Sequence, residues 1–304
     1  MKNTELNAAH QKALSNFYQY LVFERRLSEN SVEAYQRDLI KFFQFLESNS
    51  ADYNQPSLKL FRSFSAFLAS LGIDKNSIAR IFSGLRSFYH YLIHSEIITD
   101  FDPGSIEVPK TQRKLPDVLT ITEIDAILST FDRSTFQGQR DAAIIEVLYG
   151  CGLRVSELTN LAMSDLFLHD EIIRVTGKGD KQRFVPIGKS ATKQLNLYLN
   201  HFRNTIKVQK GQENFVFLGQ RGKSLTRVFV FLMVKESAQE AGIRKKVSPH
   251  TYRHSYATHM VEAGADLRLV QQLVGHESIA TTQIYTHLDD AYLKDIITQF
   301  HPRS

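Results

Sequence analysis

The sequence contains one cysteine and no tryptophan among its 304 residues. A single cysteine, Cys151, excludes a disulfide framework within the chain and is typical of proteins that work in a reducing compartment. No stretch reaches the roughly 18 apolar residues of a membrane-spanning helix, and the first residues lack the apolar core of a secretory signal. We therefore expect a cytoplasmic protein without a membrane span, in which Cys151 is a small buried hydrophobic residue.

The excess of positive charge is modest. The chain has 37 Lys and Arg residues against 32 Asp and Glu residues, a formal net charge of +5. Residues 1–110 hold 12 of each kind, so the whole excess lies in residues 111–304. A charge this small does not establish nucleic-acid binding and also fits a solvated surface, but its confinement to one part of the chain favours a polyanionic partner.

The first third of the chain has the apolar spacing of helices. From residue 32 onward, apolar side chains fall on one helical face. They are Tyr35, Leu39, Phe42, Phe43 and Leu46. We predict four helices between residues 9 and 95 that pack as a bundle. Because this spacing already accounts for the aromatic residues, they are interpreted as core rather than as platforms for base stacking.

A proline-containing basic segment follows the predicted bundle. Three prolines lie between residues 102 and 116, together with the basic run at residues 110–114, and such a composition interrupts helices. We predict a helical N-terminal domain in residues 1–108, a linker in residues 109–116 and a second domain in residues 117–304.

The second domain is predicted to be mainly α with a small antiparallel β-sheet. Residues 141–149 are typical of a buried helix. Residues 171–175 and 183–187 are typical of strands, and the glycine-rich residues 177–181 between them predict a hairpin with a lysine at its tip. Further helices are expected at about 189–206, 226–241, 250–263, 266–274 and 290–299.

Arginine, histidine, lysine and tyrosine recur in this domain in short motifs. Arginine forks match phosphate oxygens and do not deprotonate, and a tyrosine hydroxyl can become a covalent nucleophile. Donors aimed at a phosphate stabilise the charge that develops when a phosphodiester breaks. The combination indicates an enzyme that breaks and rejoins nucleic acid without a metal ion.

These motifs resemble those of the tyrosine recombinases, the phage integrase family, and in particular the bacterial Xer recombinases of the XerC and XerD type. The likeness covers nearly the whole chain, and its motifs stand in order at the spacing typical of the family. The matching segments are residues 152–158, 177–179, 250–259, 264–266, 275–287 and 301–303.

The resemblance implies a role for each of six residues. Arg154 and Arg253 would clamp the scissile phosphate, and His250 would contact it and act as a general base. His276 would hydrogen-bond a phosphate oxygen. Lys178 would protonate the leaving 5′-oxygen, and Tyr285 would attack and form a 3′-phosphotyrosine. No metal, ATP or other cofactor is implied.

The resemblance also implies an architecture and partners. Residues 1–108 would be a DNA-binding domain and residues 117–304 the catalytic domain, and the two would form a C-shaped clamp around double-stranded DNA at a dif-like site. The enzyme would resolve chromosome dimers during segregation and cell division. Four subunits would assemble, either as a homotetramer or with a second Xer recombinase, and an FtsK-like DNA translocase is a further expected partner. The helix at 290–299 would dock onto a neighbouring subunit; the alternative is packing on its own domain.

The residues of these motifs can also be interpreted without a catalytic role. Arg154 could simply pair with Glu157 at a helix start, and Lys181 competes with Lys178 for the role of acid. We interpret His254 and His259 as structural histidines. Glu157 and Asp266 are interpreted as capping or supporting residues. Tyr285 is one of 12 tyrosines and is distinguished only by its motif.

Three other functions are weighed against the Xer interpretation. A metal-dependent hydrolase would use the histidines at 250, 254 and 259, but no His-Glu-x-x-His motif accompanies them. A DNA-binding module without catalysis would not need the lysine and tyrosine. An integrase or transposase of a mobile element is the serious alternative, against which the compact length and the lack of an additional N-terminal DNA-binding domain are weighed.

Overall fold

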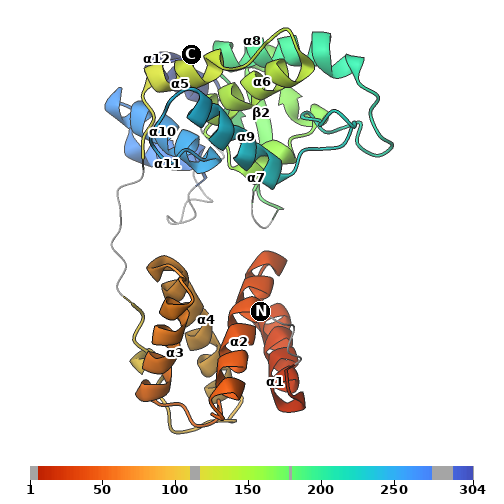
Figure 1. The fold of residues 1–304 in the computed structure, drawn as a ribbon. Helices are drawn as coiled ribbons and strands as arrows, with labels where there is room; N and C mark the ends of the chain where they lie inside the picture. Colours follow the sequence, from red (N-terminus) through yellow and green to blue (C-terminus); the bar gives the residue numbers. More distant parts are fainter. Residues whose placement is uncertain (1–5, 110–116, 178–179, 276–289, 304) are drawn as a thin grey trace. The chain divides into compact units, whose positions relative to one another are not determined.

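The computed structural model describes residues 6–109, 117–177, 180–275 and 290–303, without the side chains of residues 290–294. The chain divides into two compact units, residues 1–114 and 115–304 (Figure 1). The point of division falls inside the segment 109–116 that the sequence predicts as a linker, and most of that segment lies outside the described residues.

The first unit is a bundle of four helices, as predicted. Its helices are α1 (Ala8–Gln19), α2 (Glu29–Ser48), α3 (Leu58–Ser70) and α4 (Lys75–His94), with a π-helical extension of α1 at Tyr20–Glu24 and a 3₁₀ turn at Pro103–Ser105. The aromatic side chains fill the core. Phe42 and Phe43 are fully buried, and the rings of Phe42 and Phe64 meet edge to face with centroids 5.1 Å apart.

The second unit is mainly helical with a small antiparallel sheet, which confirms the predicted fold class. Its helices are α5 (Ile121–Ser129), α6 (Phe136–Gly150), α7 (Val155–Thr159), α8 (Lys189–Leu197), α9 (Arg227–Glu240), α10 (Pro249–Glu262), α11 (Leu267–Leu273) and α12 (Asp290–Phe300). Short π and 3₁₀ turns continue α8 as far as Thr205 and flank β1.

The sheet has the strand order β1 (Leu166–Phe167), β2 (Ile172–Thr176) and β3 (Gln182–Pro186). Strands β2 and β3 form the predicted hairpin, with Val175 opposite Arg183. Strand β1 was not predicted, because two residues are too short to show an alternating pattern.

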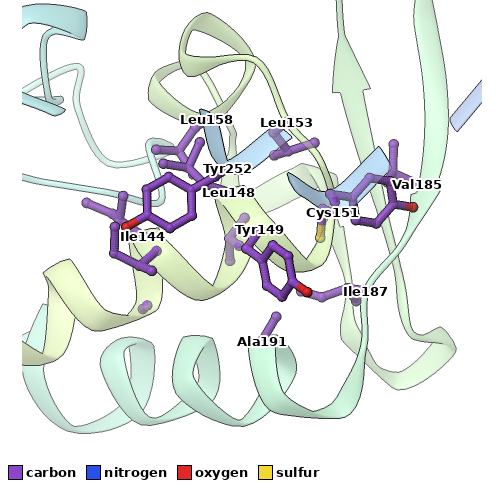
Figure 2. Packing of buried hydrophobic residues seen from close by; sticks show 14 of the residues in the cluster. Ile144, Leu148, Tyr149, Cys151, Leu153, Leu158, Val185, Ile187, Ala191 and Tyr252 are labelled. Carbon is purple, nitrogen blue, oxygen red and sulfur yellow. The ribbon is translucent and has the colours of Figure 1, made fainter. Parts of the chain in front are cut away.

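Helix α6 runs through the centre of the second unit's core. Every residue from Gly138 to Gly150 is buried, as expected for a helix surrounded by other elements. Figure 2 shows its side chains beside Cys151, Ile187 and Ala191. Cys151 is fully buried, as predicted.

The described part of α12 packs on its own domain. Ile296 and Ile297 are buried in the core of the second unit, next to strand β3. Beyond the helix, His301 is buried beside the rings of Tyr149 and Tyr256. These residues therefore pack within the subunit, and the docking of this helix onto a neighbouring subunit stays a prediction.

Candidate active site

A tight turn after α6 brings two distant segments together. Gly152 has φ +59°, and a Cβ at this position would lie 2.6 Å from the ring of Tyr256 on α10. Only glycine fits so close an approach in this conformation. The carbonyl oxygen of Gly152 then accepts a hydrogen bond of 2.9 Å from Nη1 of Arg253. The turn thus joins the start of α7 to the middle of α10.

Arg154 is held at the start of α7 by Glu157. Its backbone N–H donates to Glu157 Oε2, and its Nη1 donates to Glu157 Oε1, both at 2.8 Å. Arg154 Nη2 also donates to the carbonyl oxygen of Gly275. The pairing with Glu157, considered above as the non-catalytic alternative, is present. It orients the guanidinium without burying it, because 39% of the Arg154 side chain remains exposed.

Arg253 approaches the same carboxylate from α10. Its side chain is 7% exposed, and its Nη1 lies 4.0 Å from Glu157 Oε2. Its Nη2 donates to the carbonyl oxygen of Val274. Burial, followed by the charge of Arg154, lowers the pKa of Arg253 to about 10, so it stays charged at neutral pH.

A third arginine, Arg183 on β3, completes the cluster. Its Nη1 and Nη2 donate to the two oxygens of Glu157 at 2.7 and 3.0 Å. Burial raises the pKa of Glu157, but the hydrogen bonds and charge of Arg183, together with Arg154, outweigh it, and the net pKa is lowered. Three guanidinium groups share one carboxylate, so the cluster attracts anions.

Arg183 is the member of this cluster that the sequence did not point to. It was recognised only as the first residue of a strand. The signal in the sequence was its position two residues before the apolar Val185, which the structure shows to be fully buried. Alternate residues of a strand share a face, so an arginine on the buried face needs an acidic partner.

His250 lies on the same helix as Arg253, as predicted, and is exposed. Both residues line a depression of about 370 Å³ between α10 and α11. His254 lines the same depression, and burial together with the charge of His250 lowers its pKa. The two helices therefore leave an open space beside the arginine cluster.

The predicted supporting roles of two other residues are confirmed. The ring of His259 is 2.7 Å from the hydroxyl of Tyr149, measured at Nδ1. Asp266 caps α11 by accepting from the backbone N–H groups of Arg268 and Leu269. Both contacts are structural.

Lys178, His276 and Tyr285 lie outside the described residues. The structure does describe the residue before each of the first two. Gly177 follows strand β2, and its N–H donates to the carbonyl oxygen of Lys181 at 2.8 Å. Gly275 follows α11 and accepts the hydrogen bond from Arg154. Both glycines lie against the arginine cluster.

Among the residues that the structure describes, no group of three or more His, Cys, Asp or Glu side chains is arranged to hold a metal ion. None of the helices in the described ranges combines the length and apolar character needed to cross a membrane.

Comparison with known proteins identifies the family. The model of the phage integrase family matches residues 117–291, and that of the phage integrase N-terminal SAM-like domain matches residues 14–96. A tyrosine recombinase XerD of Listeria monocytogenes serotype 4b (strain F2365) is 44% identical over 293 residues, 96% of this chain and 99% of the relative. The XerD of Chlorobaculum tepidum is 40% identical over 96% of this chain and 97% of its own length.

Solved structures share the fold. XerH bound to palindromic difH substrate aligns with a TM-score of 0.71 at 23% identity, over 93% of this chain and 83% of that chain. A lambda integrase dimer bound to a core site aligns with a TM-score of 0.71 at 17% identity, over 88% and 95%. The matches to both family models and the near-complete coverage of the XerD relatives lead to one conclusion: the chain belongs to the phage integrase family and is a site-specific tyrosine recombinase of the Xer type.

Proposed function

We propose that Arg154 and Arg253 clamp the scissile phosphate of double-stranded DNA, with His250 beside them. The observation that carries this proposal is the cluster of three guanidinium groups around Glu157. Arg154 is the exposed member and Arg253 the buried one, so a phosphate would meet one donor at the surface of the cluster and one beneath it. His250 lines the adjoining depression, where it would contact the phosphate and take up the proton of the nucleophile.

Strand cleavage follows from the roles that the family resemblance implies. The hydroxyl oxygen of Tyr285 attacks the phosphorus, and the bond from phosphorus to the 5′-oxygen breaks. Lys178 gives a proton to that oxygen, and His276 donates a hydrogen bond to a phosphate oxygen. The product is a 3′-phosphotyrosine, and attack on it by a 5′-hydroxyl rejoins the strand. Each step exchanges one phosphate ester bond for another, so the reaction needs no ATP, and the arginine clamp would supply the positive charge that a metal ion could otherwise provide.

The proposed biological substrate is a dif-like site on the chromosome. The two domains would close around duplex DNA as a C-shaped clamp, and four subunits, alone or with a second Xer recombinase, would exchange strands and resolve chromosome dimers in the cytoplasm. An FtsK-like translocase is a further proposed partner. The XerD relatives, which match over almost their whole length, support this role over the integrase or transposase of a mobile element.

The test uses a duplex of dif-type sequence with a nick just beyond the scissile phosphate. The short leaving fragment diffuses away, so a covalent adduct accumulates and is seen on a denaturing gel. In the presence of a chelator we expect the adduct with the wild-type chain and with Tyr18→Phe, an exposed tyrosine of the first unit, but not with Tyr285→Phe. An adduct with Tyr285→Phe would refute the assigned nucleophile, and loss of the adduct in chelator would refute metal-free cleavage.

A further inference from the structure

Arg183 connects the β2–β3 hairpin to the proposed phosphate clamp. It projects from β3, opposite Val175 of β2, and its side chain is 12% exposed. Its two terminal nitrogens bind the two oxygens of Glu157, and its Nε donates to the carbonyl oxygen of Leu273 at 3.2 Å. One side chain therefore joins the hairpin, the start of α7 and the end of α11.

The same guanidinium lies against two glycines that precede proposed catalytic residues. A Cβ at Gly275, which has φ +66°, would lie 3.2 Å from Arg183 Cζ. A Cβ at Gly177 would lie 3.9 Å from Arg183 Nη1 and 3.7 Å from Glu157 Oε1. Gly177 immediately precedes Lys178, and Gly275 immediately precedes His276.

The ion pair is buried and bidentate as well as central. Glu157 is 1% exposed, and a bidentate Arg–carboxylate pair holds both orientation and distance. Removing one partner of a buried pair is costly, because the remaining charge stays without compensation. The hairpin is thus tied to the clamp by a contact that resists displacement.

We propose that Arg183 is a positioning residue, which couples the hairpin carrying the general acid to the arginine clamp. This inference rests on the proposed function, because it takes the acid to be a hairpin lysine. Arg183 donates no proton to the leaving group and touches no reacting atom. It holds the start of the hairpin turn, at Gly177, in register with Glu157, and through Glu157 with Arg154 and Arg253.

The test separates protonation of the leaving group from phosphate binding. The bridging 5′-oxygen of the scissile phosphate is replaced by sulfur in the nicked duplex, because a thiolate leaves without being protonated. We expect Arg183→Gln to cleave the oxygen substrate about 100-fold more slowly than the wild type, the lower range for loss of a general acid. On the sulfur substrate its rate should return to within about threefold of the wild-type rate.

Two matched controls use arginines that also pair with a carboxylate. Arg174 on β2 pairs with Asp165 at 2.7 Å, and the alternation of strand β2 puts it on the opposite face of the hairpin from Val175. Arg174→Gln should cleave both substrates at the wild-type rate.

Arg154→Gln removes another partner of Glu157 and should be slow on both substrates. Arg183→Lys keeps the charge without the fork, so it should show a smaller oxygen-specific defect.

Thermal unfolding first establishes that Arg183→Gln is folded. If the folded variant cleaves both substrates equally slowly, or both at the wild-type rate, the proposal is overturned. If Arg183→Gln does not fold, the same comparison with Arg183→Lys decides. Failure of the proposed function would look different. If the sulfur substrate does not rescue Lys178→Ala, Lys178 is not the acid. If it still rescues Arg183→Gln, the coupling holds and Lys181 becomes the candidate for the acid.

Discussion

Arg303, at the C-terminal end of the chain, binds both carboxylate oxygens of Glu146 in the middle of α6. The Nε of Arg303 is 3.1 Å from Glu146 Oε2, and its Nη2 donates to Oε1. Glu146 is 2% exposed, Arg303 is 17% exposed, and Arg303 also pairs with Asp125. Burial lowers the pKa of Arg303, but its pairs with Glu146 and Asp125 outweigh this effect and raise it overall, so the arginine stays charged.

Replacing this arginine should destabilise the second unit. Arg303→Ala leaves Glu146 buried with a hydroxyl donor, Ser190, at 3.1 Å but without its cation. We expect the free energy of unfolding to fall by about 3 kcal/mol, measured by urea denaturation of the full chain. The double variant Arg303→Ala/Glu146→Gln should recover part of the loss, because it no longer buries an uncompensated charge; no recovery would contradict this account.

Arg253→Lys should separate cleavage from binding. A lysine ammonium cannot donate from two fixed directions, whereas Arg253 reaches both Gly152 and Val274. We expect adduct formation to fall at least about 100-fold, while affinity for the duplex changes by less than about tenfold. Gel shift and single-turnover cleavage measure the two quantities. Arg62→Lys, at an exposed pair with Glu107 in the first unit, is the control and should cleave normally.

Gly152→Ala should destabilise the turn that joins α6 to α7. The substitution adds strain at φ +59° and a clash with the ring of Tyr256, so a loss of about 3 kcal/mol is expected. Gly242→Ala is the matched control: its φ is +73°, but a Cβ there meets nothing within 4 Å, so only about 1 kcal/mol should be lost. Similar midpoints for the two variants in thermal unfolding would argue against the clash with Tyr256.

Acid should loosen the C-terminal packing through His301. Burial, together with the charge of His259, lowers the pKa of His301 from 6.5 to about 4. Between these values the unfolded chain binds a proton that the folded chain does not. The free energy of unfolding is therefore unaffected by His301 above pH 6.5 and falls as the pH decreases toward 4, by about 3 kcal/mol at most.

Urea denaturation at pH 7 and pH 5 measures this dependence. His301→Gln should lose less stability between the two values than the wild type. The slope will not vanish, because burial also lowers the pKa of His259. Equal losses in the wild type and the variant would rule out His301 as a source of the dependence.

Features with a local cause could be predicted from the sequence. The helices, the hairpin and the pairing of Arg154 with Glu157 follow from periodicity, turn residues and a spacing of three. His250 and Arg253 were placed on one helix for the same reason. The family resemblance supplied the proposed roles, including those of the three site residues that lie outside the described ranges.

What escaped prediction depends on contacts between distant segments. Arg183 meets Glu157 across 26 positions and Leu273 across 90, and no local pattern specifies such pairs. Strand β1 exists only because β2 offers it hydrogen-bonding partners. The family resemblance singled out the C-terminal residues 301–303. The pairing of Arg303 with Glu146 joins residues 157 positions apart, and only the folded structure reveals it.

The sharing of Glu157 among three arginines has a consequence for the timing of catalysis. Like charges repel, so without Glu157 the guanidinium groups of the proposed clamp, Arg154 and Arg253, would separate in water, and a phosphate would have to bring them together at each encounter. Here a buried carboxylate gathers them when the chain folds. The reorganisation that would otherwise accompany every strand exchange is completed once, before any DNA arrives.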